Sequence, residues 1–259
     1  MHEVKKDGIL FHRFDHLGHC DRLCHGVFTR QGGVSAPPFD SLNVTDGLGD
    51  APAHVRENRQ RILRATGGTD LMWMRQVHGT RVHIAEKGAA IGTPVADALI
   101  TAIPGLLLVV QAADCQPVLL YDPRRHIAAG VHSGWKGSVA NILGRTVAGM
   151  ISEFGCRPAD ILAGIGPSLG PCCAEFRHYQ TELPEAFQAY KGPRSHFDFW
   201  AISVDQLCRA GLQKDNIEVQ KVCTRCHDDR YFSYRAEKIT GRFAAVIGLS
   251  PPQPTKQTQ

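Results

Sequence analysis

The chain has 259 residues, of which 43% are hydrophobic and 21% charged, and its formal net charge is +4. This composition is typical of a globular protein that can bury a substantial core. The mild charge forms no lysine- or arginine-rich block, which argues against a nucleic-acid partner. No apolar stretch approaches the ~20 residues that span a bilayer, and the N-terminus has no uninterrupted apolar segment. We therefore expect a cytoplasmic protein with no membrane partner.

The predicted elements mix helices and strands. Asp50 and Pro52 predict a helix that runs to about Arg64 and ends at Gly67–Gly68. Apolar runs predict strands at 71–79, 81–87, 98–101, 106–114, 117–122, 126–132, 161–167, 217–222 and 241–249. A periodic apolar face predicts a helix over 138–154, and further helices are expected near 180–190 and 203–213. Because strands and helices do not alternate regularly, we expect an α+β fold with a mixed sheet and not a doubly wound nucleotide fold.

Polar and proline-rich residues end the chain. The segment that follows the last predicted strand cannot form a packed core, because it lacks apolar residues. We find no repeat and no linker before it. We therefore predict one catalytic domain over residues 1–250 and a disordered tail over 251–259.

The strands at 117–122 and 126–132 are joined by a Pro-Arg-Arg turn and should form a hairpin. Cys115 stands at the entrance of the first strand and His132 at the exit of the second. An antiparallel return brings these two positions to one edge of the sheet, where a thiolate and an imidazole can meet. Although a buried free cysteine is the commoner case, Asp114 before the thiol and two glycines soon after the imidazole favour a chemical role.

His78 is a third candidate, since it closes the predicted strand at 71–79. Any single one of the 13 histidines is more often satisfied by the backbone than used as a ligand. Three similar strand-end positions favour a metal site instead. A set of two histidines and one cysteine leaves the fourth position of a tetrahedral zinc ion open, as in catalytic sites.

The nine cysteines do not indicate a disulfide framework, because their number is odd and the cytosol keeps thiols reduced. Cys20 and Cys24 with His25, together with Cys223 and Cys226 with His227, allow a structural zinc site as the lesser hypothesis. Cys172 and Cys173 follow a glycine-rich loop. We interpret them as packing residues, since adjacent cysteines rarely share one metal ion.

Ordered motifs along nearly the whole chain resemble the YfiH-type laccase-domain family. They include FTRQGG, HVRENR, RQVHG, AADCQPVLLYD, HSGWKG, GIGPSLGPCC and FSYRAEKITGR. The resemblance implies a layered α-β-β-α fold with mixed sheets. It also implies one catalytic zinc ion held by His78, Cys115 and His132.

The activities linked to this family are phosphorolysis of adenosine, inosine and methylthioadenosine, and adenosine deamination. We therefore predict a zinc-dependent purine nucleoside phosphorylase with adenosine deaminase side activity, whose partners are a small nucleoside and phosphate. Some members are described as editing factors for peptidoglycan precursors. A metal-free Cys-His hydrolase or such an editing amidase is thus the alternative. We make no prediction of the oligomeric state.

This chemistry makes Cys115, Asp114 and Arg59 candidate catalytic residues and adds candidates that contact substrate. The guanidinium groups of Arg59 and Arg30 can grip phosphate, because a planar fork binds oxyanions bidentately. Asn43 and Gln76 can hydrogen-bond ribose or base. Asp114 is either a proton shuttle or a partner that orients a metal ligand.

Two other interpretations concern the same motifs. Phe232, Tyr234 and Arg235 can stack on a base, but residues of this kind more often close a core, so we leave them outside the site. A His2Cys set would also satisfy copper, and copper bound in vitro can give weak polyphenol oxidase (laccase) activity. The sequence has no His-x-His pair, which argues against a native multicopper oxidase.

Overall fold

The strands form two six-stranded sheets in the computed structural model, which describes residues 1–88 and 92–252. The first sheet contains, in spatial order, β1 (His2–Lys6), β2 (Ile9–Arg13), β3 (Leu23–Phe28), β12 (Phe243–Leu249), β7 (Leu106–Ala112) and β4 (Asp70–Met72). The second contains β11 (Ile217–Val219), β10 (Leu162–Ile165), β8 (Gln116–Asp122), β9 (Ile127–Ser133), β6 (Ala98–Thr101) and β5 (Val82–Ile84). Both sheets pair parallel and antiparallel strands.

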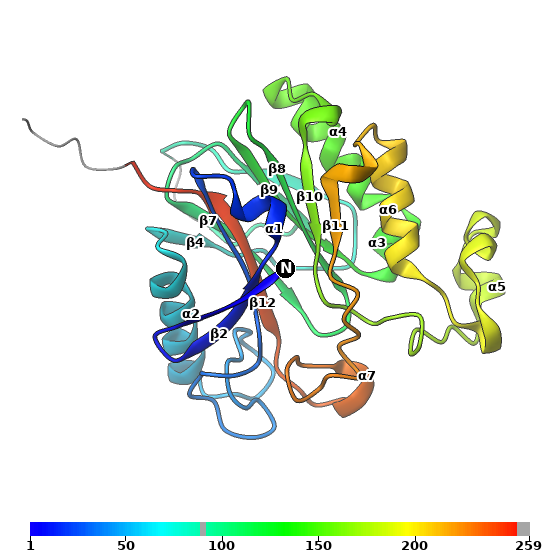
Figure 1. The fold of residues 1–259 in the computed structure, drawn as a ribbon. Helices are drawn as coiled ribbons and strands as arrows, with labels where there is room; N and C mark the ends of the chain where they lie inside the picture. Colours follow the sequence, from blue (N-terminus) through cyan, green and yellow to red (C-terminus); the bar gives the residue numbers. More distant parts are fainter. Residues whose placement is uncertain (89–91, 253–259) are drawn as a thin grey trace, which may run out of the picture.

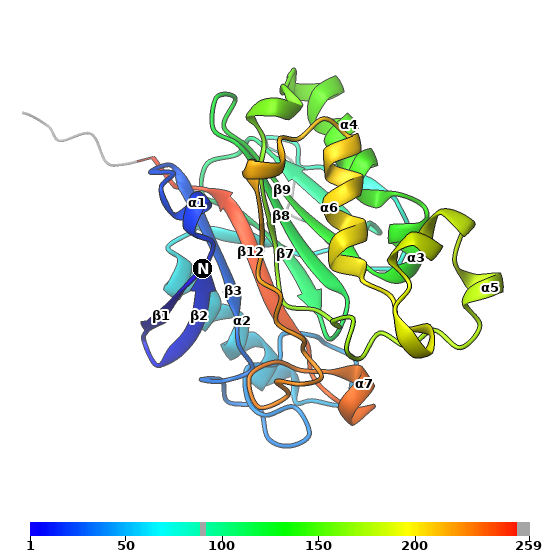
Figure 2. The ribbon, with the colours of Figure 1, turned by 45° about the vertical axis from the view of Figure 1, so that its right-hand side comes forward.

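Helices cover the outer faces of the two sheets (Figures 1 and 2). The α-helices are α1 (Asp15–Gly18), α2 (Pro52–Thr66), α3 (Trp135–Val139), α4 (Ile142–Phe154), α5 (Tyr179–Glu182), α6 (Phe199–Arg209) and α7 (Tyr234–Glu237). Short 3-10 turns lie at Pro158–Asp160, Glu185–Tyr190, Pro193–Ser195 and Lys214–Asn216. Helix α2 packs on the first sheet, while α4 and α6 pack on the second. The predicted α+β fold with α-β-β-α layers is therefore confirmed.

Three apolar layers hold this sandwich together, and alternate residues of the central strands supply them. On β7, Leu108 and Val110 point into the layer between the sheets, whereas Val109 points toward α2. On β8, Leu119 joins the layer between the sheets and Leu120 the layer under α4 and α6. Because side chains alternate across a strand, a strand buried on both faces is a continuous apolar run. Such apolar runs are the reason why the central strands can be predicted from the sequence.

The hairpin at the centre of the second sheet agrees with the prediction, and other elements differ in their limits. Strands β8 and β9 pair antiparallel, with Pro117 opposite His132. The single helix predicted over 138–154 is divided into α3 and α4 by Asn141, which has a φ of 57° and accepts a hydrogen bond from the Gly144 N–H. The strand predicted at 71–79 ends at Met72. The predicted tail lies outside the described residues from position 253 onward.

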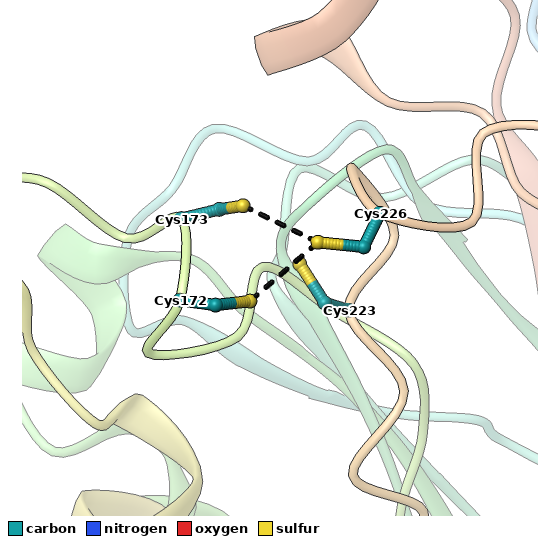
Figure 3. Close-up of side chains that lie close together, drawn as sticks. All are labelled: Cys172, Cys173, Cys223 and Cys226. Carbon is teal, nitrogen blue, oxygen red and sulfur yellow. Dashed lines mark hydrogen bonds between the residues drawn. The ribbon is translucent and has the colours of Figure 1, made fainter.

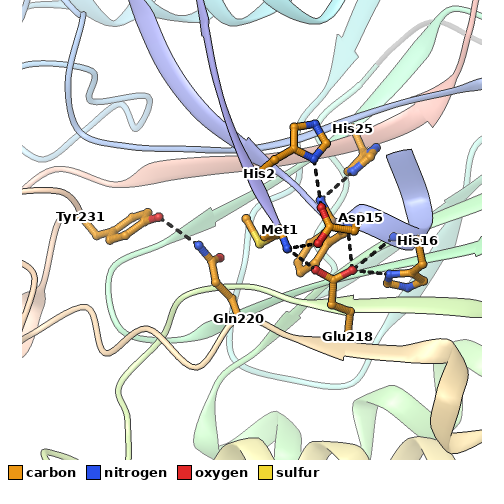
Figure 4. Close-up of polar contacts among 9 residues, drawn as sticks. Met1, His2, Asp15, His16, His25, Glu218, Gln220 and Tyr231 are labelled. Carbon is orange, nitrogen blue, oxygen red and sulfur yellow. Dashed lines mark hydrogen bonds and ion pairs between the residues drawn. The ribbon is translucent and has the colours of Figure 1, made fainter. Parts of the chain in front are cut away.

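A polar cluster ties the first residues of the chain to β11 (Figure 4). The Met1 amino group pairs with Glu218 at 2.8 Å and with Asp15. Glu218 also accepts the Asp15 backbone N–H at 2.8 Å and lies 2.6 Å from His16 Nδ1. These contacts join an edge of the first sheet, through α1, to the edge strand of the second.

Beside this cluster, His25 serves as a buried hydrogen-bond acceptor. Its Nε2 accepts the Phe14 backbone N–H at 3.0 Å, and 1% of the residue is exposed. Burial lowers the pKa of His25 to about 3. A neutral acceptor buried in this way fits a core residue. His25, Cys20 and Cys24 do not join the C-terminal cysteines among the metal-holding groups of the described residues.

We expect His25 to make the protein less stable as the pH falls below about 6.5, the ordinary histidine pKa. Below that pH the unfolded chain binds a proton at His25 that the folded state does not bind. Each further unit of pH decrease therefore lowers the free energy of unfolding by about 1.4 kcal/mol. Urea unfolding at about pH 7 and about pH 5 should show a loss of about 2 kcal/mol from this group. The His25→Gln variant should lack that part, whereas the exposed-residue control His19→Gln should keep it. Equal losses in wild type and His25→Gln would contradict the assignment.

Candidate metal centre

His78, Cys115 and His132 converge at one end of the second sheet. Their ligand atoms all lie within 4.8 Å of one another, and the two imidazole rings meet edge to face with centroids 4.9 Å apart. The β8–β9 hairpin explains why Cys115 and His132 are close. Cys115 directly precedes β8, and His132 on β9 lies opposite Pro117 on β8. His78 comes from a loop and has a φ of 59°. The expectation that it closes a strand was therefore wrong, although it does reach the other two.

Asp97 holds this loop in place. Its fully buried carboxylate accepts the backbone N–H of His78 at 2.9 Å and that of Gly79 at 2.7 Å. It also lies 2.9 Å from His132 Nδ1. Because Nδ1 faces Asp97, Nε2 of His132 remains for a metal ion, and a carboxylate behind a histidine ligand fixes its tautomer. Sequence reasoning missed Asp97, whose signal was a lone carboxylate before the apolar strand β6.

The electrostatics favour a thiolate at Cys115. Burial raises the pKa of Cys115. The nearby His132 and His78 lower it by more than burial raises it, so the pKa lies below the ordinary cysteine value. Burial lowers the pKa of His132, while the Cys115 thiolate and Asp97 raise it above its ordinary value. A thiolate is both the metal-binding and the nucleophilic form of cysteine.

The donor set fits a metal ion. One thiolate and two imidazoles suit Zn²⁺ or copper and leave a fourth coordination position open. Gly134 allows the ligands to come this close, since a Cβ there would lie 2.8 Å from His78 Cδ2 and 3.2 Å from Cys115 Sγ. The residues present would therefore hold such an ion.

A cavity of about 790 Å³ opens beside the three ligands. Its aromatic lining consists of Trp73, Trp135, Phe176, Phe199 and Tyr234. Four arginines also line it: Arg59, Arg75, Arg235 and Arg242. The cavity thus offers flat apolar surfaces and several cationic groups next to the metal ligands, which suits a flat anionic or phosphate-bearing ligand.

Two of the predicted substrate residues lie in the cavity wall. Arg59 stacks over the Trp73 ring at 4.2 Å, and its guanidinium pairs with Asp46 at 2.6 Å. Gln76 also lines the cavity, but its amide nitrogen donates to the Gln111 carbonyl and its oxygen accepts the Gln111 N–H, both at 2.8 Å. Gln76 therefore fastens its loop to β7, while Arg59 presents a cation.

The other two predicted substrate residues are not among the cavity-lining residues. Asn43 is fully buried, donates to Asp50 at 2.9 Å and accepts the Arg242 N–H at 2.9 Å. It therefore positions Arg242, one of the cavity arginines. Arg30 lines a separate hollow, where it pairs with Glu237 at 2.8 Å. The structure therefore places neither side chain in the cavity wall beside the candidate metal ligands.

Asp114 lines the cavity but uses its carboxylate to brace loops. It accepts the hydroxyls of Thr224 and Ser233, both at 2.7 Å, and the Arg235 backbone N–H at 2.6 Å. Among these two carboxylates it is Asp97, and not Asp114, that hydrogen-bonds a candidate metal ligand, His132. Tyr234 and Arg235, which the sequence predicts to lie outside the site, line the cavity, whereas Phe232 is fully buried.

The sequence matches the family described as multi-copper polyphenol oxidoreductase laccase over residues 24–250. The chain belongs to this family.

Particular members resemble it over most of their length. The chain is 38% identical to the protein named purine nucleoside phosphorylase YfiH of Escherichia coli K12 over 232 residues, covering 85% of this chain and 91% of the relative. It is 39% identical to a purine nucleoside phosphorylase of Mycobacterium tuberculosis H37Rv, covering 88% and 92%. The crystal structure of Bacillus licheniformis YfiH superposes with a TM-score of 0.86 at 30% identity, covering 95% of this chain and 97% of that one.

Among the described residues, the two groups of side chains that are placed to hold a metal ion do not form a multicopper cluster. They are the set formed by His78, Cys115 and His132, and a second group of four cysteines. A trinuclear copper cluster needs many imidazoles, and the sequence contains no His-x-His pair.

Within residues 1–88 and 92–252, no helix is both long and apolar enough to cross a membrane.

Proposed function

We propose that the protein is a zinc-dependent purine nucleoside phosphorylase that cleaves adenosine, inosine and methylthioadenosine and deaminates adenosine as a side reaction. The observation that carries the proposal is the cavity at the His78, Cys115 and His132 cluster, whose wall combines aromatic rings with arginines. The names of the relatives support the same reaction class.

The lining matches the parts of a nucleoside. Aromatic faces such as Trp73 and Tyr234 suit a purine base, since stacked rings gain both buried area and favourable electrostatics. Phosphorolysis joins phosphate to C1′ of the ribose and releases the base, so the enzyme must hold an oxyanion beside the sugar. Arg59 and Arg242 can supply charge-assisted hydrogen bonds to that anion.

The residues of the chain set up this chemistry. His78, Cys115 and His132 would hold the zinc ion, which supplies Lewis-acid character at the cavity wall when bound. Asp97 fixes the His132 ring, and Asn43 positions the backbone of Arg242. The aromatic wall excludes water from the bound base.

Replacing Arg59 with alanine should impair phosphorolysis more than deamination. Only phosphorolysis needs a bound phosphate, and a lost charge-assisted hydrogen bond costs about 1.5–3 kcal/mol, or about a ten- to hundredfold rate loss. The assay supplies adenosine with and without phosphate and follows adenine and inosine separately. The exposed Arg56 on the same helix gives the control Arg56→Ala, which should behave as wild type. An equal loss of both reactions would contradict phosphate binding by Arg59.

A metal-free Cys-His hydrolase is the second candidate, because Cys115 and His132 favour a thiolate beside an imidazolium. In that case Cys115 would attack the substrate and form a covalent adduct. Chelator-treated protein would stay active, and mass spectrometry would detect the adduct. Cleavage of a muramyl-amino acid, with no adenine or inosine from adenosine, would favour this candidate.

A further inference from the structure

Four cysteines outside the candidate catalytic centre meet at one point (Figure 3). Cys172 and Cys173 lie in the loop after β10, and Cys223 and Cys226 lie in the segment after β11. Their sulfur atoms are all within 4.8 Å of one another. The Cys226 sulfur is 3.6 Å from that of Cys172 and 3.5 Å from that of Cys173. The sequence predicts that Cys223 and Cys226 lie near Cys20 and Cys24, and that Cys172 and Cys173 are packing residues. In the structure Cys223 and Cys226 lie beside Cys172 and Cys173 instead.

Apolar packing does not explain this cluster. Cys173 and Cys223 are buried, but Cys172 and Cys226 are exposed. A thiol is only a weak hydrogen-bond donor, so two exposed side chains gain little by turning toward the same point. All four are free thiols in the structure. Their convergence on a common centre is the arrangement expected of ligands.

The spacing agrees with a tetrathiolate zinc site. A Zn–S bond of about 2.3 Å places sulfurs about 3.8 Å apart at the corners of a tetrahedron. Cys223-x2-Cys226 has the spacing of a zinc knuckle, and its turn is closed by the His227 N–H, which donates to the Cys223 carbonyl at 3.1 Å. The His227 ring nitrogen Nδ1 lies 3.0 Å from the same carbonyl, so that nitrogen faces the backbone and not the sulfurs.

The other two ligands come from one tight turn. The N–H groups of Cys173 and Ala174 both donate to the Gly170 carbonyl at 2.9 Å. This turn lets adjacent cysteines present both sulfurs to the opposite segment, which the sequence rule for adjacent cysteines did not anticipate. Arg235 donates to the Cys173 carbonyl at 3.1 Å, which ties this turn to the segment that contains α7.

We propose that Cys172, Cys173, Cys223 and Cys226 bind one structural Zn²⁺ ion. Four thiolates fill all coordination positions, so this site is closed and would not perform catalysis. Soft sulfur ligands exclude magnesium and calcium. The proposal is independent of the proposed function, which rests on a different set of ligands.

The position of the cluster explains its use. The loop after β10 carries Leu169 and Ala174 into the cavity wall. The opposite segment carries Thr224, whose hydroxyl donates a hydrogen bond to the Asp114 carboxylate. The Thr224 backbone N–H donates to the Ser168 carbonyl at 3.0 Å. A metal ion between these two segments fastens the wall of the cavity. Its binding free energy therefore adds to the stability of the folded state.

The test compares zinc content after gel filtration under reducing conditions. We expect Cys172→Ser/Cys226→Ser to carry about one zinc ion per chain fewer than wild type. With zinc also in the candidate catalytic centre, wild type carries about two ions and Cys115→Ala about one, which is the ion of the cysteine cluster. The double variant changes the two exposed cysteines, which endangers folding least. Cys24→Ser/Cys208→Ser is the matched control and should keep both ions. The double variant should also melt at least about 5 °C below this control.

A spectroscopic readout keeps the test independent of folding losses and of activity. In Cys115→Ala, Co²⁺ can occupy only the cysteine cluster. It should give the intense visible bands and the thiolate charge-transfer absorption of a tetrahedral tetrathiolate. Loss of these features when Cys172 and Cys226 are also replaced supports the site. Equal zinc in wild type and the double variant, iron in place of zinc, or a disulfide between the two segments found by thiol alkylation would overturn it.

Discussion

Replacing Cys115 with alanine should remove both the metal ion of the candidate catalytic centre and the nucleoside activity. The thiolate is the one anionic ligand of the set, and His78 and His132 alone leave the ion with two neutral donors. Changes behind a ligand weaken metal binding by about 10- to 100-fold, so loss of the ligand itself should exceed about a hundredfold. The same loss should appear in the phosphorolysis rate.

Metal content and steady-state rates measured on one preparation test this expectation. Cys208→Ser, which changes a cysteine on α6, should retain metal and rate. Cys115→Asp separates a ligand from a nucleophile, because a carboxylate can bind the ion but is a much weaker nucleophile than a thiolate. Partial recovery of metal and rate in Cys115→Asp supports the ligand role. A chelated wild type that remains fully active would contradict it and favour the hydrolase.

The part of this site that the sequence predicted is the part made by local structure. Cys115 and His132 are close because one hairpin joins them, and the apolar runs of β8 and β9 specify that hairpin. The sequence indicates His78 as the end of a strand, but in the structure that strand already ends at Met72. The His78 loop reaches the centre through Asp97, a contact across 19 residues that no periodic pattern reports.

The rest of the cavity depends on long-range contacts. Arg242 lies in the wall with its backbone held by Asn43, which is 199 positions away in the sequence. Arg30 has the same chemistry as Arg59, but its ion pair with Glu237 turns it into a separate hollow. Residue type alone therefore predicts a phosphate-binding role equally for both arginines, whereas tertiary packing places only Arg59 in the wall of the cavity. The cysteine cluster shows the same limit, because only the fold brings its two segments together.

Replacing Asp97 with asparagine should weaken metal binding without removing a ligand. Asparagine has nearly the same size, and with its amide oxygen in place of Oδ2 it can still accept the backbone N–H groups of Val77 and Gly79. Its NH2 group, however, would then oppose two N–H groups that now face the other carboxylate oxygen, those of the His78 backbone and of His132 Nδ1, each at 2.9 Å. The His132 ring then loses the partner that fixes its tautomer and orientation. We expect about a 10- to 100-fold loss of metal affinity.

A metal titration distinguishes this positioning role from general destabilisation. The phosphorolysis rate of Asp97→Asn should be low in stoichiometric zinc and should rise toward the wild-type value in excess zinc, since all three ligands remain. Asp122→Asn is the control: Asp122 is also fully buried, but it accepts the N–H groups of Arg124 and Arg125 in a turn at the far end of the hairpin. It should lower the unfolding free energy and leave metal affinity unchanged. Wild-type metal affinity in Asp97→Asn would show that His132 needs no carboxylate behind it.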